Sequence, residues 1–222
     1  MTDSENDEID VPVCIIDDDE DVRSSIANLL RSCGHVVETF SGPAEFKGRN
    51  GCRAVACLIL DVRLKGANGL DFQEELLQSQ HSIPIVLMSG HGDVPMTVRG
   101  MRAGAITFLP KPFREEELLA AVREAIGIGE LRRRDEGAHA ELRNRFVTLT
   151  PRERDVLGLV AAGLMNKQIA GQLAISEITV KIHRGNAMRK MKADSLADLV
   201  RMAEKLGARE NQSRYGRAQS ID

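Results

Sequence analysis

The chain has 222 residues, enough for two ordinary domains, and its 42% hydrophobic and 28% charged residues are typical of a globular protein. No stretch approaches the roughly 20 apolar residues of a membrane-spanning helix, so we expect no membrane partner. The first ten residues hold five acids and no basic residue, which excludes a secretory signal and predicts a cytoplasmic protein with an acidic, disordered tail over residues 1–11.

The net charge changes sign along the chain. Residues 1–128 hold 12 Lys and Arg against 21 Asp and Glu, a net charge of −9, whereas residues 129–222 hold 18 against 12, a net charge of +6. An acidic half suits a divalent cation and a basic half suits nucleic-acid phosphates, although a charge run alone is more often a solvated face. The charges therefore favour two domains with different ligands.

The four cysteines do not indicate a zinc site. They lack Cys-x-x-Cys spacing, and the five histidines are scattered. Cys14 and Cys57 fall inside apolar runs. We expect both to be buried thiols that behave as small apolar side chains.

Short apolar runs alternate with segments of helical period in the first half of the chain. The runs at residues 13–16, 55–60, 83–88 and 105–109 are predicted to be buried parallel strands. Two helices are marked by apolar faces, one with Val22, Ile26, Leu29 and Leu30, the other with Leu118, Leu119, Val122, Ala125 and Ile126. This alternation predicts an α/β domain over residues 12–128, with five short strands and about five helices in a flavodoxin-like, doubly wound (βα)5 arrangement.

Polar residues follow these strands at the points where the strands end. Asp17 and Asp18 follow the first run, Asp61 the second, Ser89 the third, and Lys111 lies just beyond the fourth. A lone aspartate after a strand is usually a cap or turn residue. Here the carboxyl ends of parallel strands would bring the whole set into one crevice. Clustered carboxylates need a cation, and oxygen-only ligands suit Mg²⁺, so the sequence predicts a magnesium site.

In these residues and spacings, residues 12–126 resemble the receiver domain of two-component response regulators. The stretch Ser89-Gly90-His91-Gly92-Asp93-Val94-Pro95-Met96 is similar to the NarL/FixJ branch, closest to FixJ-like regulators. The resemblance implies that Asp61 accepts a phosphoryl group from a sensor histidine kinase. It also implies roles for the remaining site residues: Ser89 and Phe108 as switch residues, Lys111 as the cation facing the phosphoryl group, and Asp17, Asp18, Asp61 and the backbone carbonyl of Arg63 as ligands of Mg²⁺.

One position departs from the family pattern. Lys65 stands where receiver domains commonly have proline, in the segment after Asp61 that we interpret as a loop. The departure removes none of the reactive groups, but it leaves the rigidity of that loop open.

Residues 129–146 are predicted to be a partly helical linker. The segment is rich in charged residues that favour helices, but Gly127, Gly129 and Gly137 weaken any single long helix.

The second domain, predicted over residues 147–209, opens with a strong helix start. Thr150 is the expected N-cap, Pro151 the first helical residue, and Glu153 completes a capping box. Gly163 ends this helix, a second follows over residues 166–173, a third is capped by Ser176, and a fourth begins at Ser195. Two helices joined by a tight turn in a basic unit predict a helix-turn-helix, followed by a flexible tail over residues 210–222.

Residues 148–206 resemble the LuxR-type DNA-binding domain. The matching residues are Leu149-Thr150-Pro151-Arg152-Glu153, Asn166-Lys167-Gln168-Ile169-Ala170, Ser176, Thr179-Val180-Lys181 and His183. On a helical wheel, Val180, Ala187, Met188 and Met191 form the core side of the third helix. The residues predicted to contact double-stranded DNA are Thr179, Lys181, Ile182, Gly185, Asn186 and Arg189. Arg184 falls nearer the core side and ranks lower.

These features favour a phosphorylation-switched transcription regulator that is not an enzyme. Its expected partners are a sensor histidine kinase, promoter DNA, RNA polymerase and, on phosphorylation, a second copy joined through residues 94–103 and 107–109. Activation rather than repression is implied by the resemblance alone. A phosphatase would need an acid where Arg63 stands. A constitutive DNA-binding protein with a degenerate receiver, used only for dimerisation, would leave the acid cluster and Lys111 unexplained.

Overall fold

The computed structural model describes residues 11–49, 54–78, 83–90 and 94–207. The chain separates into two compact units, Met1–Arg133 and Arg134–Asp222, and each is described by itself. The predicted tails lie outside the described residues, apart from residue 11. No helix in the described ranges combines the length and the apolar content needed to cross a membrane.

The first unit is built on a five-stranded parallel sheet, with the strands in the order β2-β1-β3-β6-β7. The strands are β1 (Val13–Ile16), β2 (Val37–Phe40), β3 (Cys57–Asp61), β6 (Ile85–Ser89) and β7 (Thr107–Pro110). The doubly wound α/β prediction is therefore confirmed. The apolar runs located four of these strands, each within two residues of its observed bounds. They did not locate β2, because its Glu38 and Thr39 are only half-buried at the sheet edge.

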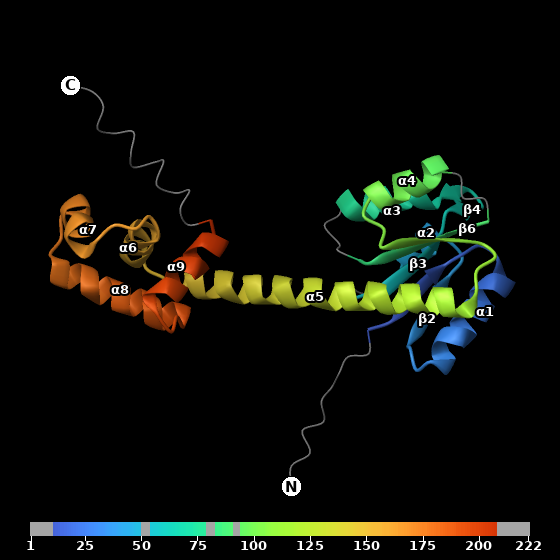
Figure 1. Cartoon of the computed structure of the whole chain (residues 1–222), viewed down its shortest axis with the longest axis horizontal. Coiled ribbons are helices and arrows are strands. Elements are labelled where there is room, and N and C mark those ends of the chain that lie inside the picture. Colours follow the sequence, from blue (N-terminus) through green and yellow to red (C-terminus); the bar gives the residue numbers. More distant parts are fainter. Residues whose placement is uncertain (1–10, 50–53, 79–82, 91–93, 208–222) are drawn as a thin grey trace, which may run out of the picture. The chain divides into compact units, whose positions relative to one another are not determined.

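Helices cover both faces of this sheet (Figure 1). On one face lie α1 (Glu20–Ser32) and the start of α5, on the other α2 (Pro43–Lys47), α3 (Gly69–Gln78) and α4 (Val94–Arg102). Ile26 and Leu30 of α1 pack with Leu118 and Val122 of α5 in one apolar cluster, as the two predicted faces require. Phe46, Leu70 and Phe72 pack in the second cluster, across the sheet.

The segment after Asp61 is a small hairpin rather than an irregular loop. Two strands of two residues, β4 (Arg63–Leu64) and β5 (Ala67–Asn68), pair antiparallel and leave Lys65 and Gly66 as the connection. Gly66 has a φ of 78°, which glycine adopts without strain. The hairpin pairing and this glycine define the loop in place of a proline.

The expectation that Gly127, Gly129 and Gly137 prevent a single long helix is wrong. One helix, α5 (Glu115–Val147), runs through Gly127, Gly129 and Gly137. At Gly129 a side chain would not fit, because a Cβ atom would lie 2.7 Å from Cγ of Pro84 and 3.2 Å from the carbonyl oxygen of Ala56. Gly129 therefore lets α5 approach closely the residues that precede β6 and β3.

Contacts beyond Gly129 stabilise the rest of α5. Arg133 donates a hydrogen bond to the carbonyl oxygen of Val55 at 3.3 Å, and Leu142 is buried in the core of the second unit. A helix-interior glycine costs about 1 kcal/mol relative to alanine. Packing at both ends of α5 outweighs this cost, as is usual for helices in proteins.

The second unit contains the four predicted helices, α6 (Pro151–Ala161), α7 (Asn166–Leu173), α8 (Glu177–Met191) and α9 (Leu196–Lys205), besides the end of α5. The Thr150 capping box and the Ser176 and Ser195 N-caps are present. Gly163, with a φ of 84°, follows the end of α6. The helix-turn-helix geometry is thus confirmed in α7 and α8.

The capping-box glutamate also binds a lysine inside this unit. Glu153 is buried, and its Oε2 accepts hydrogen bonds from the Thr150 backbone N–H at 2.8 Å and from Lys190 Nζ at 2.7 Å. Burial acts to raise the pKa of Glu153, but the bonds from Lys190 and Thr150 outweigh it and hold the pKa below its ordinary value of 4.5. Ionised Glu153 therefore stabilises the unit.

We expect Glu153→Gln to lower the free energy of unfolding of this unit by about 2 kcal/mol at neutral pH, because Lys190 loses its charged partner. A depressed carboxyl pKa stabilises above the unfolded value and loses that contribution as the pH falls through the folded value. The difference between variant and parent should therefore shrink below pH 4.5. Urea unfolding followed by circular dichroism tests this. Asp155→Asn is the control, because the ion pair of Asp155 with Arg152 is longer, at 3.7 Å.

Of the cysteines in the described residues, two lie in the sheet. Cys14 and Cys57 are fully buried, and desolvation raises the pKa of each thiol to about 12. Cys14 belongs to the cluster under α2 and α3, and Cys57 to the cluster under α1 and α5. Cys33 is exposed, and Cys52 lies outside the described residues.

Candidate functional site

The predicted site residues of the first unit meet at one edge of the sheet. Asp17 directly follows β1, Asp61 and Ser89 are the last residues of β3 and β6, and Lys111 directly follows β7. Because all five strands are parallel, these positions share the carboxyl edge, where open α/β sheets place their ligands.

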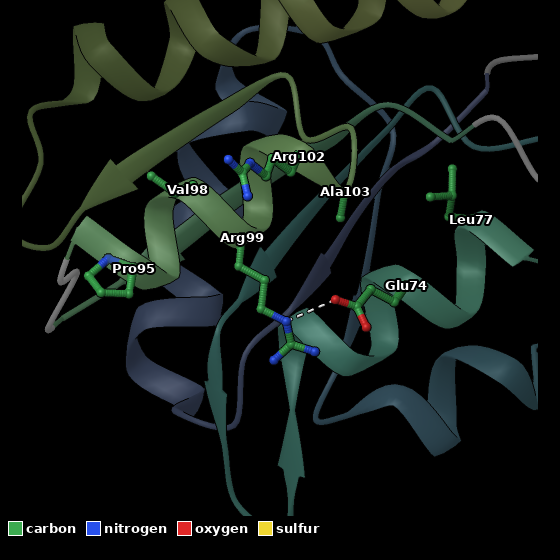
Figure 2. Close-up of a pocket in the computed structure, with 7 residues that line it drawn as sticks. All are labelled: Glu74, Leu77, Pro95, Val98, Arg99, Arg102 and Ala103. Atoms are coloured by element: carbon green, nitrogen blue, oxygen red, sulfur yellow. Dashed lines mark hydrogen bonds and ion pairs between the residues drawn. The ribbon is translucent and has the colours of Figure 1, made fainter.

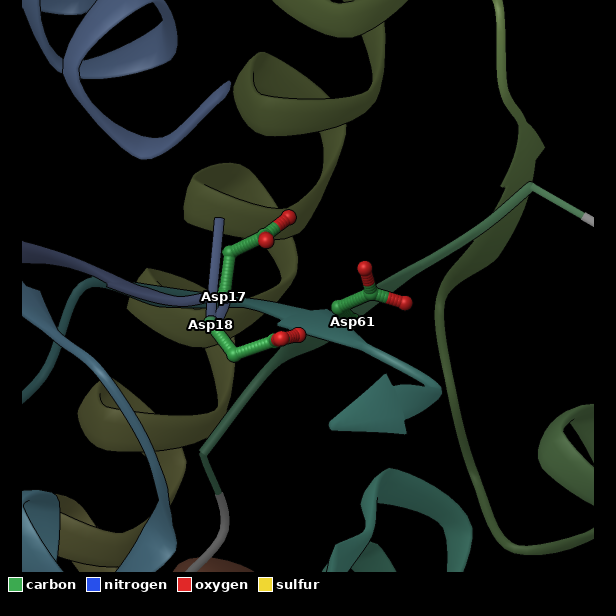
Figure 3. Close-up of side chains that lie close together, drawn as sticks. All are labelled: Asp17, Asp18 and Asp61. Atoms are coloured by element: carbon green, nitrogen blue, oxygen red, sulfur yellow. The ribbon is translucent and has the colours of Figure 1, made fainter. Parts of the chain in front are cut away.

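Three carboxylates form a compact cluster at this edge (Figure 3). Asp17, Asp18 and Asp61 each offer an oxygen atom that lies within 4.8 Å of the others. Asp17 and Asp61 are buried, and Asp18 is half-buried. Carboxylates this close repel each other unless positive charge lies among them.

Lys111 supplies part of that charge. Its Nζ donates hydrogen bonds to Oδ2 of Asp17 and Oδ2 of Asp61, each at 2.6 Å. The other carboxylate oxygens accept backbone N–H bonds at 2.9 Å, Asp17 from Asp19 and Asp61 from Arg63. Lys111 thus bridges the ends of β1 and β3.

The site favours the protonated form of Lys111, whereas ionisation of the Asp17 carboxyl is costly. Burial raises the pKa of Asp17 and outweighs the hydrogen bond from Lys111. Burial acts to lower the pKa of Lys111, but its bonds to Asp17 and Asp61 prevail and raise it. The Asp17 carboxylate would therefore gain from further positive charge.

Two residues contact the cluster or its backbone in ways that the sequence did not predict. Lys65, on the hairpin, makes an ion pair with Oδ2 of Asp18 at 3.2 Å, although its side chain is 86% exposed. Gly69, at the start of α3, lies against the Asp61 backbone: a Cβ atom there would be 2.2 Å from the Asp61 carbonyl oxygen. The glycine could have been recognised only from the observed close approach.

The two predicted switch residues lie on neighbouring strands, Ser89 at the end of β6 and Phe108 within β7. Ser89 is fully buried, and its carbonyl oxygen accepts the backbone N–H of Lys111 at 2.7 Å. Phe108 is half-buried against the apolar cluster under α2 and α3 and pairs with Leu87 in the sheet. Both residues therefore lie on β6 and β7, next to α4.

The pocket found in the first unit is distinct from the acid cluster. It is a depression of about 530 Å³ between α3 and α4 (Figure 2). Its lining residues are Glu74, Leu77, Pro95, Val98, Arg99, Arg102 and Ala103. Arg99 binds Glu74 at 2.8 Å and Asp71 at 2.6 Å, so its charge is already neutralised. The depression contains none of the predicted site residues.

In the second unit, the predicted faces of α8 are observed. Val180, Ala187 and Met191 are fully buried, whereas Lys181, Ile182, Gly185 and Arg189 are exposed. Asn186 is half-buried and accepts a bond from Arg189 at 2.6 Å, and Thr179 is half-buried beside the Ser176 hydroxyl at 2.9 Å. Arg184, which ranked lower, donates a hydrogen bond to the side chain of Asn166 at 3.2 Å.

Comparisons with known proteins agree with both units. Residues 13–123 match the family described as "Response regulator receiver domain", and residues 147–203 match "Bacterial regulatory proteins, luxR family". The chain is 50% identical over 199 residues to nodulation protein W of Bradyrhizobium diazoefficiens, covering 90% of this chain and 88% of that protein.

Solved structures of full chains are also similar. The response regulator StyR is 47% identical, with a TM-score of 0.77 over 88% of this chain and 99% of that one. Full-length FixJ from B. japonicum is 38% identical, with a TM-score of 0.54 over 89% and 97%. The chain therefore belongs to the two-component response regulators that join a receiver domain to a LuxR-type DNA-binding domain and regulate transcription.

Proposed function

We propose that Asp61 accepts a phosphoryl group from a sensor histidine kinase and that this modification controls dimerisation and sequence-specific DNA binding. The observation that carries the proposal is the position of Asp61 within the acid cluster, with Lys111 Nζ 2.6 Å from its Oδ2. A carboxylate oxygen can attack phosphorus to form an acyl phosphate, as the bond between phosphorus and the donor group breaks and that group leaves. Lys111 would stay near the phosphoryl oxygens and offset their charge.

The donor set fits Mg²⁺, because it consists of clustered carboxylate oxygens with no sulfur or imidazole among them. Asp17, Asp18 and Asp61 would hold the ion together with the backbone carbonyl of Arg63. When bound, Mg²⁺ supplies positive charge that favours an incoming phosphate.

The phosphoryl signal would pass through Ser89 and Phe108 to α4 and β7. The Ser89 hydroxyl would bind a phosphoryl oxygen, and Phe108 would turn inward. Val94, Val98 and Met101 of α4 are 77%, 42% and 44% exposed, which suits a surface that pairs with a second copy. The homodimer would place two copies of α8 on half-sites about one helical turn apart.

The regulated unit would act on promoter DNA in the cytoplasm, together with RNA polymerase, and would activate transcription without being an enzyme. Lys181, Ile182, Gly185, Asn186, Arg189 and Thr179 are proposed to contact DNA. The functional limits of the two domains are proposed at residues 12–128 and 147–209, joined by residues 129–146.

Incubation with acetyl phosphate and Mg²⁺ tests the proposal. We expect one base-labile phosphoryl group per chain by mass spectrometry, absent from Asp61→Asn and dependent on a divalent cation. Asp19→Asn is a matched control, because Asp19 caps α1 through its side chain and asparagine caps equally well. Undiminished phosphorylation of Asp61→Asn at another residue would show that Asp61 is not the acceptor.

A further inference from the structure

Two large apolar side chains stand exposed on the recognition helix. Ile178 and Ile182 of α8 are 70% and 56% exposed, whereas Val180, between them in sequence, is fully buried. At 100° per residue, each isoleucine lies about 160° from Val180, on opposite sides, so the two are about 40° apart and one turn apart along the helix. They form a ridge, which we call the isoleucine ridge, directly opposite the core.

The fold of the unit does not account for this ridge. β-Branched residues are poorer helix formers than leucine, alanine or lysine, and these two gain little from burial. A single exposed isoleucine would need no explanation, but two adjacent ones form a continuous apolar strip. Such a strip on the outer face of a helix is suited to contact with a ligand.

The surroundings of the ridge favour DNA as that ligand. Lys181 and Arg189 are exposed on the outward half of α8. On the helical wheel, Arg189 lies between the two isoleucines, about 20° from each. The exposed acid Glu177, at the first position of α8, lies about 100° away from Ile178 on the same wheel. Ile178 is the second residue of α8, and the first residues of a recognition helix are those that contact base edges.

The major groove offers one apolar group for such a ridge, the C5 methyl group of thymine. Four residues of helix rise about 6 Å, which is close to two base-pair steps of about 3.4 Å each. We propose that Ile178 and Ile182 form a paired reader that contacts the methyl groups of two thymines about two base pairs apart in each half-site. The inference rests on the proposed use of α8 in DNA recognition and adds Ile178 to the residues that set specificity.

Deoxyuridine substitution tests the proposal, because it removes the thymine methyl group and leaves base pairing unchanged. A binding sequence is first selected from random DNA with the phosphorylated full-length protein. Each thymine is then replaced singly by deoxyuridine, and dissociation constants are measured by fluorescence anisotropy of labelled DNA. At two positions per half-site we expect affinity to fall about fourfold, the effect of losing one buried methyl group.

The variants assign each contact. Ile178→Ala should abolish the response to deoxyuridine at one of the two positions, and Ile182→Ala at the other. Neither variant should unfold at a lower temperature than the parent, because both side chains are exposed and alanine is the better helix former. Val147→Ala is the control, since Val147 is 65% exposed in the same unit but lies outside α8. Val147→Ala should change neither the affinity for the selected DNA nor the response to deoxyuridine at any position.

Specific binding without a deoxyuridine response at any position would overturn the isoleucine reader and leave DNA recognition by α8 intact. The reader is also overturned if Ile178→Ala weakens thymine and deoxyuridine sites equally, or if the ridge proves to contact a protein instead. Failure to select any sequence from random DNA would instead count against the proposed sequence-specific function.

Discussion

Gly69→Ala is expected to lower the free energy of unfolding of the receiver unit by about 3 kcal/mol. The new methyl group would lie 2.2 Å from the carbonyl oxygen of Asp61 and 3.0 Å from Cα of Val62, both backbone atoms. The start of α3 cannot simply withdraw, because the Gly69 N–H donates to the Val62 carbonyl oxygen at 2.9 Å. The strain should displace Asp61 and slow its phosphorylation as well.

Far-UV circular dichroism in urea measures the effect, since the chain has no tryptophan and 1 tyrosine. Gly127→Ala is the matched control in the same unit, because its Cβ would meet nothing within 4 Å. That variant should gain up to about 1 kcal/mol through helix propensity. Equal stability of the two variants would mean that the contact between α3 and β3 relaxes at little cost.

Lys111→Met should have an effect of similar size but of different character. Methionine matches the four-atom stem of the lysine side chain and removes the ammonium group that lies 2.6 Å from both Asp17 and Asp61. Breaking such a partly buried ion pair leaves two carboxylates facing each other, at a cost of about 3 kcal/mol in the absence of metal. Mg²⁺ should then raise the melting temperature of the variant more than that of the parent, because it replaces the missing charge.

Lys65→Met separates this effect from a general loss of charge. Lys65 also contacts the cluster, but its side chain is 86% exposed, so its ion pair with Asp18 is worth at most about 1 kcal/mol. Melting curves with EDTA and with Mg²⁺ should show a large gap for Lys111→Met and a small one for Lys65→Met. Similar curves for both would assign the stabilisation to net charge rather than to the Lys111 bridge.

Much of the architecture follows from local sequence rules. The capping box of Thr150 and Glu153 and the N-cap at Ser176 fix helix starts within a few residues, so they could be predicted accurately. The positions of Asp61 and Lys111 at strand ends could be predicted as well, because a parallel sheet brings those ends to one edge. The hydrogen bonds between these residues could not be predicted, because the order of the strands in the sheet decides which strand ends are neighbours.

Features that depend on tertiary contact were missed. The edge strand at Val37–Phe40 lacks a continuous apolar run, and helix propensity alone ends α5 early. In α5 the decisive interaction is the fit of Gly129 against Pro84 and Ala56, distant in sequence. The roles of Gly69 and Lys65 near Asp61 likewise arise from contacts that no spacing reveals.

The two buried cysteines give the receiver sheet a native chemical reporter on each face. Cys14 contacts the apolar layer beneath α2 and α3, and Cys57 contacts the layer beneath α1 and α5. With pKa values near 12, neither thiol reacts with an alkylating reagent until its own layer opens and admits water. The ratio of alkylation at Cys14 to that at Cys57 therefore reports which helical layer separates from the sheet first, without any introduced label.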